Sequence, residues 1–215
     1  MAGRNQTYMS KNGLLIVLSG PSGSGKDTVL EKLLKLDDNI VKSVSATTRP
    51  SRDGEIDGKD YFFVSEETFC DAISNKTLLE HAKYCDNYYG TSKKAVEKLL
   101  NSGKDVVLKI ETEGAKQIKE KCEDSLRIFI LPISMEILAD RLFKRGTEDK
   151  KSLESRLARA VDEIAYSLDY DYIVINDDAD KCAQNIFSII NAEKFRVCRM
   201  KNIVNEVLNN AKTID

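Results

Sequence analysis

The chain has 215 residues, of which 41% are hydrophobic and 32% are charged, so it is long enough to bury one substantial core. Its longest apolar run, residues 14–18, is far shorter than the roughly 20 residues that cross a bilayer, which excludes a membrane-spanning protein. The formal net charge of −2 provides no broad basic field, so we expect neither a membrane nor a nucleic acid as partner.

The numbers and spacing of cysteine and histidine restrict the kinds of disulfide and metal site that the chain can form. The 5 cysteines are odd in number and lack CxxC spacing, which disfavours a disulfide scaffold or a zinc site and indicates a cytoplasmic location. His81 is the only histidine, so multi-histidine metal sites are excluded, and we expect a structural role for it. Residues 1–10 are polar and lack the apolar core of a secretory signal, and we expect them to form a flexible N-terminus.

The first half of the chain alternates short apolar strands with helices, starting with an apolar strand at 14–19 and a helix at 28–36. Residues 46–60 are polar and rich in turn-forming residues, which indicates a functional loop. Around this loop the pattern predicts strands at 40–45, 61–64, 78–84 and 88–91, and helices starting after 65 and at 92–102.

The second half repeats the alternation more regularly. It predicts strands at 105–110, 126–131 and 171–176, and helices at 114–121, 135–144, 147–170 and 179–211, the last with a bend. Strands that alternate with helices are typical of an α/β fold with a parallel sheet. The mixed pattern after the second strand predicts an inserted small α+β subdomain.

A glycine-rich loop follows the first strand. Residues 20–26 read G-P-S-G-S-G-K and fit G-x-x-x-x-G-K between a buried strand and a helix, which is the context this phosphate-binding motif requires. Its backbone N–H groups would bind phosphate oxygens, and Lys26 would reach the β- and γ-phosphates. The alternative is a Gly/Ser-rich turn without a ligand, and the agreement of motif and context favours the nucleotide site.

One position departs from the motif. Phosphate-binding loops usually continue with Ser or Thr, whose hydroxyl binds Mg²⁺, but this chain has Asp27 and then Thr28. An acid in the first helical turn suits the helix dipole but lies close to phosphates that would repel it.

Several further stretches carry a resemblance. They are SGPSGSGK, SVSATTRPSRDGEIDGKDYFFV, LLEHAKYCDNYYGTS, ILP, RGTEDKKSLESRL and YDYIVIND. From about residue 14 to the C-terminal helix, the chain resembles the guanylate kinase family. The resemblance implies one domain over 11–215, with a P-loop kinase core whose parallel sheet is flanked by helices (11–45, 94–144 and 166–215), a small α+β GMP-binding subdomain (46–93) and a helical lid (145–165).

The resemblance also implies an activity and its residues. The activity is phosphoryl transfer from ATP to GMP, and to dGMP, with Mg²⁺, as part of purine nucleotide metabolism. The residues implied for ATP are Gly20, Pro21, Ser22, Gly23, Ser24, Gly25, Lys26, Asp27, Thr28, Arg141 and Asn176. Those implied for GMP are Ser45, Arg49, Arg52, Tyr61, Glu80, Tyr89, Thr91 and Glu111. Those implied around the transferred phosphoryl group are Lys26, Arg49, Arg145 and Arg156.

The implied GMP residues suit their ligand chemically. Arg49 and Arg52 are planar, permanently charged donors for a monophosphate, although they could also be solvated loop charges. Glu80 can accept hydrogen bonds from N1–H and N2–H₂ of guanine, whereas adenine would leave it unpaired. The alternative for Glu80 is an exposed acid on a strand.

The implied lid arginines have a role in the transition state, where they neutralise the transferred phosphoryl group as the lid closes. The alternative is a solvent-exposed charged helix, and we expect Arg159 to be a surface residue. The tyrosines expected to serve mainly in packing are Tyr84, Tyr88, Tyr170 and Tyr172.

A second departure from the family pattern lies in LKIETEGA. Lys109 occupies a position where the family usually has an acid, and Asp27 occupies one where a hydroxyl is usual. We interpret the two as a charge pair between neighbouring strands, with Asp27 as the one protein candidate for a metal ligand. The alternative is two independent substitutions.

Two rival functions use the same fold. A non-catalytic binding module related to guanylate kinase would tend to lack the loop lysine and the lid arginines, which are present here. For a kinase of another nucleoside monophosphate, Glu80 disfavours adenine, whereas the altered stretch at 109–113 leaves this alternative open.

Overall fold

The computed structural model describes residues 13–84, 86–144 and 150–211. Its strands are β1 (Leu15–Ser19), β2 (Ile40–Lys42), β3 (Ala46–Thr47), β4 (Phe62–Phe63), β5 (Leu78–Tyr84), β6 (Asn87–Ser92), β7 (Asp105–Lys109), β8 (Leu126–Pro132) and β9 (Tyr172–Asn176). Its α-helices are α1 (Lys26–Leu34), α2 (Glu66–Ser74), α3 (Lys93–Asn101), α4 (Thr112–Lys121), α5 (Met135–Lys144), α6 (Lys150–Ala165), α7 (Ala179–Glu193) and α8 (Val197–Ala211).

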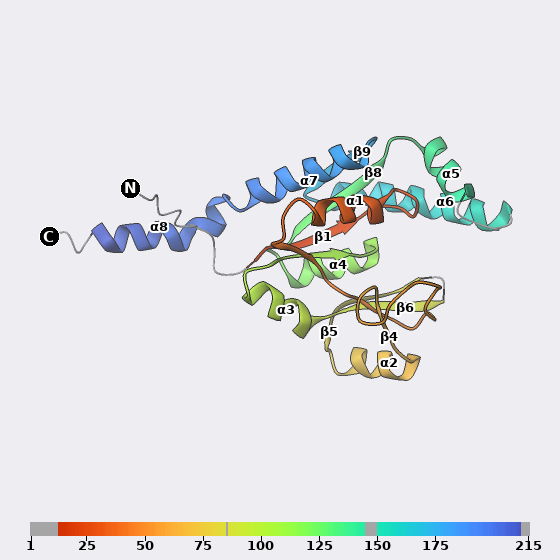
Figure 1. Ribbon diagram of the computed structural model, residues 1–215, viewed down its shortest axis with the longest axis horizontal. Helices are drawn as coiled ribbons and strands as arrows, with labels where there is room; N and C mark the ends of the chain where they lie inside the picture. Colours follow the sequence, from red (N-terminus) through yellow and green to blue (C-terminus); the bar gives the residue numbers. More distant parts are fainter. Residues whose placement is uncertain (1–12, 85, 145–149, 212–215) are drawn as a thin grey trace.

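A five-stranded parallel sheet forms the centre of the molecule, with the strand order β2-β7-β1-β8-β9 (Figure 1). β1 is the middle strand and pairs with β7 on one side and β8 on the other. Its carboxyl end therefore lies between those of two neighbours, which is where ligands bind in open α/β sheets. The predicted α/β class and parallel sheet are confirmed.

Alternate residues of β1 enter opposite sides of the core. Ile16 and Leu18 pack with apolar residues of α1 and α7, whereas Leu15 and Val17 pack with those of α3 and α4. A strand buried on both faces needs apolar residues at every position, because successive side chains point to opposite faces. The uninterrupted apolar run of β1 meets this need.

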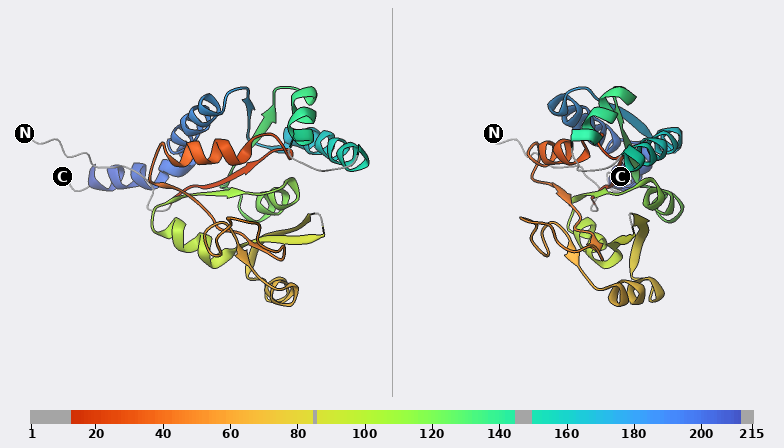
Figure 2. Two further views of the ribbon diagram at one scale, coloured as in Figure 1. Left: turned by 45° about the vertical axis from the view of Figure 1, so that its right-hand side comes forward. Right: turned by 90° about the vertical axis from the view of Figure 1, so that its right-hand side faces the viewer.

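A second sheet lies beside the first, in the order β4-β3-β6-β5, with α2 on its outer side (Figures 1 and 2). β5 and β6 form an antiparallel hairpin, and β3 pairs in parallel with β4. The N-terminus of α2 is capped by Ser65, whose hydroxyl accepts a hydrogen bond from the Thr68 N–H at 3.1 Å. The predicted α+β insertion is thus present between β2 and α3.

Several element boundaries differ from the prediction. The expected strand at 40–45 ends at Lys42, because the chain then crosses to the second sheet, where Ser45 accepts a hydrogen bond from the Phe62 N–H. The expected loop at 46–60 contains β3. The long charged helix ends as the short 3-10 turn Tyr166–Asp169.

The expected bent helix at 179–211 is two helices, α7 and α8. Figure 1 shows α8 extending away from the body of the molecule. No helix within the described ranges is both long enough and apolar enough to cross a bilayer.

Candidate functional site

The glycine-rich loop joins β1 to α1 and requires its glycines. Gly25 is the N-cap of α1 with φ 89°, and a Cβ there would lie 2.4 Å from the Asn176 Nδ2. A Cβ on Gly20 would lie 2.4 Å from the Ile130 carbonyl oxygen. Larger side chains would collide with groups that β8 and β9 place around the loop.

Side chains from distant parts of the chain gather on this loop. The Lys26 ammonium donates hydrogen bonds to the carbonyl oxygens of Gly20 and, at 3.2 Å, of Pro21. Asn176 at the end of β9 donates to the Ser24 carbonyl oxygen at 2.7 Å. Arg156 of α6 donates to the Ser22 hydroxyl at 2.7 Å.

Other residues expected at the ATP site lie nearby. Arg141 of α5 has a buried Nη1 that makes no hydrogen bond with any described residue, and this nitrogen lies 3.8 Å from the Cβ position of Gly25. Asp27 and Thr28 are exposed on the first turn of α1. Arg145 lies outside the described residues, so its expected role stays a prediction.

A second group of expected residues lines a cavity of about 330 Å³ beside α1 and β7. The predicted residues among its lining are Asp27, Arg49, Arg52, Tyr61, Tyr89 and Lys109. The Arg49 guanidinium is 5.5 Å from the centroid of the Tyr61 ring, and the Tyr61 and Tyr89 rings are 6.0 Å apart. The structure thus brings the arginines and tyrosines expected at a monophosphate site to one cavity.

The loop arginines are ordered by an acid that sequence reasoning missed. The Glu55 carboxylate accepts from Arg49 Nη2 at 2.8 Å and from the backbone N–H of Arg52 at 2.8 Å. The hydrogen bond from Arg49 lowers the pKa of Glu55 below its usual value. Only its spacing of six residues from Arg49 could have suggested the pair, since nothing local distinguishes Glu55 from other acids of this polar loop.

Glu80 forms a third group with Thr91. The Glu80 residue is 3% exposed, which rules out the exposed-acid alternative. The Thr91 hydroxyl donates to Glu80 Oε1 at 2.6 Å, and a Cβ on Gly114 of α4 would lie 2.4 Å from Glu80 Oε2. Burial raises the pKa of Glu80 to about 7. Near this pH, a hydrogen-bond donor beside the carboxylate would favour its ionised form.

The two remaining residues expected at the GMP site are less closely tied to Glu80. Ser45 lies between β2 and β3, and among the described residues its side chain makes no hydrogen bond to Glu80 or Thr91. Glu111 is the N-cap residue of α4, and its Oε2 is buried without a hydrogen-bond partner in the described part of the chain. A buried carboxylate oxygen of this kind is available to a ligand.

The predicted contact between Asp27 and Lys109 is present. The Lys109 ammonium donates to Asp27 Oδ1, so the first turn of α1 is linked to the end of β7. The Lys109 side chain is 17% exposed and the Asp27 side chain 58%, which places the ion pair at the edge of the cavity. Lys42 lies close by, and burial together with the Lys109 ammonium lowers the pKa of Lys42.

The helix α6 brings two further residues to the site. Glu163 is buried, and burial together with the nearby Glu111 carboxylate raises its pKa. Arg159 pairs with Glu163 at 3.1 Å, and its guanidinium lies 4.3 Å from the centroid of the Tyr84 ring in β5. The Arg159 side chain is 44% exposed, which confirms the expected surface position, and these two contacts also link α6 to the second sheet.

The expected packing role is confirmed for Tyr88 and Tyr170, whereas Tyr172 is 36% exposed and donates a hydrogen bond to Glu193 Oε1 at 2.7 Å. Tyr88 stacks on Phe69 with ring centroids 5.5 Å apart, and Tyr170 packs edge-on against Phe129 at 5.2 Å.

The donor groups fit a magnesium ion that is held mainly by its substrate. No cluster of three or more His, Cys, Asp or Glu side chains suited to a metal occurs among the described residues. Mg²⁺ is commonly bound through one or two carboxylates together with phosphates and water. Asp27, already engaged by Lys109, is the carboxylate beside the loop that could approach such an ion.

Taken together, a complete phosphate-binding loop at the end of a parallel sheet and a second, arginine-containing cavity beside it define a P-loop protein built to bind two phosphorylated ligands. The family model described as guanylate kinase matches residues 12–193. The chain therefore belongs to the guanylate kinase family.

Relatives agree over nearly the whole chain. A guanylate kinase of Clostridioides difficile (strain 630) is 50% identical over 91% of this chain and 96% of its own length. A guanylate kinase of Lactiplantibacillus plantarum is 48% identical over 95% of this chain and 100% of its own length. The crystal structure of guanylate kinase from Anaplasma phagocytophilum superimposes with a TM-score of 0.74 at 38% identity, covering 90% of this chain and 92% of the other.

Proposed function

We propose that this protein transfers the γ-phosphoryl group of ATP to GMP, and also to dGMP, forming ADP and the nucleoside diphosphate. The observation that carries the proposal is the buried Glu80 carboxylate, hydrogen-bonded by Thr91, in a molecule that also has a complete phosphate-binding loop. A buried acceptor that would be left unpaired by the wrong base is an effective means of selecting guanine.

The reaction would depend on position and charge. The loop amides and Lys26 would hold the ATP phosphates, and Arg49, Arg52, Tyr61 and Tyr89 would hold the phosphate of GMP. Arg156, already at the loop through Ser22, and Arg145 would neutralise charge on the phosphoryl group in transit. Arg141 and Asn176 would contact the adenosine end, and Ser45, Thr91 and Glu111 would add contacts to guanine.

Mg²⁺ is the proposed cofactor. When bound, it would neutralise charge on the phosphates. We propose that phosphates and water hold most of its coordination sites, with Asp27 as the one side chain proposed to contact it.

The proposed location is the cytoplasm, within purine nucleotide metabolism. All four cysteines of the described ranges are free thiols, which supports a reducing compartment.

A panel of acceptors tests the proposal. ADP release from ATP and Mg²⁺ would be followed with GMP, dGMP, IMP, AMP and UMP at equal concentrations. We expect GMP and dGMP to be used and AMP and UMP to be used at least about 10²-fold less well in kcat/KM, because a carboxylate cannot pair with adenine N1. Preference for AMP or UMP would overturn the assignment, and ATP binding without transfer to any acceptor would favour the non-catalytic module.

The raised pKa of Glu80 gives a pH-dependent affinity for GMP. Only the ionised carboxylate accepts both guanine donors, and its pKa in the free protein is about 7. GMP should therefore bind more weakly as the pH falls below 7, by up to about tenfold per pH unit, with release of a proton on binding. Calorimetry between pH 5.5 and 8.5, in buffers of different ionisation enthalpy, measures both quantities.

The control for this measurement is Glu80→Gln. The phosphate of GMP also titrates, with a second pKa of about 6, and this contribution remains in the variant. If the wild type and the variant show the same pH profile, Glu80 does not read the base.

The pair formed by Asp27 and Lys109 should be energetically coupled. Deleting one partner leaves the other charge uncompensated beside the phosphates, so Asp27→Ser and Lys109→Asp should each reduce activity or stability. The double variant, which restores a hydroxyl and an acid, should recover much of the loss. A double-mutant cycle in free energy of unfolding and in kcat/KM should show coupling above about 0.5 kcal/mol. Additive effects would leave two unrelated substitutions.

A further inference from the structure

A second cavity lies behind β5, and none of the residues assigned to nucleotides lines it. Its volume is about 650 Å³, which lies within the usual range for small-molecule sites. Its lining comes from β1, α2, β5, α3 and α4, and consists of Leu15, Ile73, Lys76, Leu78, Leu79, His81, Lys93, Val96, Glu97, Leu100, Lys121 and Cys122. The proposed mechanism gives none of these residues a part.

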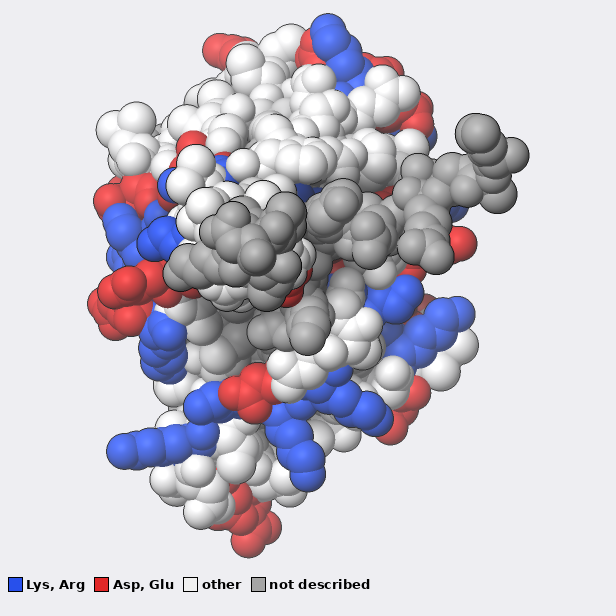
Figure 3. Space-filling model, turned by 90° about the vertical axis from the view of Figure 1, so that its left-hand side faces the viewer, with Lys and Arg blue, Asp and Glu red and all other residues white. Residues whose placement is uncertain are grey.

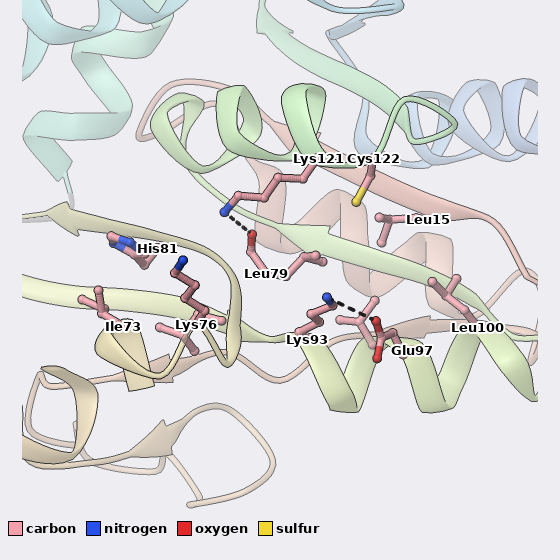
Figure 4. A pocket seen from close by; sticks show the side chains of 12 residues that line it. Leu15, Ile73, Lys76, Leu79, His81, Lys93, Glu97, Leu100, Lys121 and Cys122 are labelled. Carbon is pink, nitrogen blue, oxygen red and sulfur yellow. Dashed lines mark hydrogen bonds and ion pairs between the residues drawn. The ribbon is translucent and has the colours of Figure 1, made fainter. Parts of the chain in front are cut away.

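The cavity has two chemically different ends. Figure 4 shows the side chains of Lys76, Lys121 and His81 toward one end, and Leu100 and Cys122 toward the other. The single acid of the lining, Glu97, is 3.9 Å from Lys93. Basic groups therefore outnumber acidic ones around a mainly apolar interior.

The basic groups retain hydrogen bonds to offer. Lys121 donates to the Leu79 carbonyl oxygen at 2.9 Å, and an ammonium has two further N–H donors. Lys76 makes no ion pair with any described carboxylate. Figure 3 shows Lys and Arg side chains, with some Asp and Glu side chains among them, on the lower half of the face seen from the left of Figure 1.

We propose that this cavity binds an amphipathic carboxylate, with its anionic group among the lysines and its hydrocarbon tail along Leu79, Val96 and Leu100. The charged end alone would suit any anion, and the apolar interior alone would suit any hydrocarbon. Together they select a ligand that carries one anionic group on an apolar body of medium length, such as a medium-chain fatty acid.

The cavity is lined by residues from both the inserted subdomain and the layer over the central sheet, so a bound ligand would affect how these two parts are arranged. Ile73 of α2 and Lys76, which follows α2, belong to the inserted subdomain, whereas Leu100 of α3 and Cys122, the C-cap residue of α4, belong to the layer that covers the central sheet. A ligand that fills this cavity stabilises the arrangement of the subdomain seen here, and any rearrangement that accompanies GMP binding must then work against it.

The contact with the GMP site is direct. Leu79 and His81 line the cavity on either side of Glu80, and α4 holds this strand through Gln117, which bonds the His81 backbone N–H at 3.2 Å and the His81 carbonyl oxygen at 2.6 Å. Binding of the carboxylate should therefore weaken binding of GMP, and GMP should weaken the carboxylate by the same factor. This coupling rests on the proposed function, whereas binding to the cavity does not.

Decanoate is the probe that tests the proposal. Calorimetric titration of the full chain without nucleotides should show one saturable site with a Kd below about 1 mM. Decan-1-ol and decyltrimethylammonium, which have the same tail without the negative charge, should bind at least about tenfold more weakly. Absence of saturable decanoate binding, or equal binding of the three probes, would overturn the site.

Two variants locate the binding. Lys76→Gln with Lys93→Gln removes charge, and Ile73→Trp fills space; each should weaken decanoate at least about tenfold. The matched control is Lys94→Gln with Lys98→Gln, two exposed lysines of α3 outside the lining, which should leave binding unchanged. If both test variants bind decanoate like the wild type, the ligand does not occupy this cavity.

The coupling is measured on the same wild-type protein. Saturating decanoate should raise the Kd for GMP about fivefold or more, and the double variant Lys76→Gln/Lys93→Gln should lose this effect while it keeps its affinity for GMP. An unchanged Kd for GMP would overturn the coupling. A protein that binds decanoate but no GMP would instead contradict the proposed function and leave the carboxylate site standing.

Discussion

The turnover of the Lys26→Ala variant with ATP and GMP is expected to be about 10²–10³-fold lower than that of the wild type. The Lys26 ammonium lies within the phosphate-binding loop, where it bonds the carbonyl oxygens of Gly20 and Pro21. Its removal takes a preorganised positive charge away from the place where negative charge develops on the transferred group. Initial rates of ADP formation at saturating ATP and GMP measure the loss.

The fold should survive this change, because Lys26 is only partly buried and its ammonium bonds carbonyl oxygens of the loop itself. Circular dichroism and thermal unfolding provide the control. Lys32→Ala is a matched variant on the same helix, since Lys32 pairs with Asp180 away from the loop, and it should keep near-normal turnover. Retention by Lys26→Ala of more than a tenth of the wild-type turnover would contradict the role given to the loop.

The Glu80→Gln variant is expected to bind GMP about 10–100-fold more weakly, while the affinity for ATP stays close to that of the wild type. The amide would present a donor toward the donors of guanine, in a position that is almost fully buried. Calorimetric titration of each nucleotide separates the two affinities.

Thr91→Val serves as the companion variant. It removes the hydroxyl that bonds Glu80 Oε1 at 2.6 Å but keeps the carboxylate, so its loss of GMP affinity should be smaller. An unchanged affinity of Glu80→Gln for GMP would mean that another acid reads the base, and Glu111 would be the next residue to change.

The elements predicted most accurately are those dictated by local chemistry. The apolar run of β1 followed by glycines and Lys26 predicts both the central strand and the loop after it. The Asp27–Lys109 contact could also be predicted from sequence. It required only that the strand before Asp27 and the strand that carries Lys109 be neighbours, which the pairing of β1 with β7 confirms.

Contacts between segments that are distant in the sequence were harder to predict. The link from Arg159 to Tyr84 joins α6 to the second sheet and depends on how the two parts pack, which no local pattern encodes. Burial of Glu163 near Glu111 was equally hard to predict, because an acid on a heavily charged helix is expected to be solvent-exposed. The division of 179–211 into two helices also depends on α7 packing against the core while α8 leaves it.

Direct transfer requires that one protein molecule bind ATP and GMP at the same time. Its most direct test is to incubate the protein with ATP labelled at the γ-phosphate, unlabelled GMP and Mg²⁺, and to separate the products by anion exchange. We expect the label in the β-phosphate of GDP, with one ADP formed for each GDP. Label that appears as free inorganic phosphate, or that remains in ATP, would contradict it.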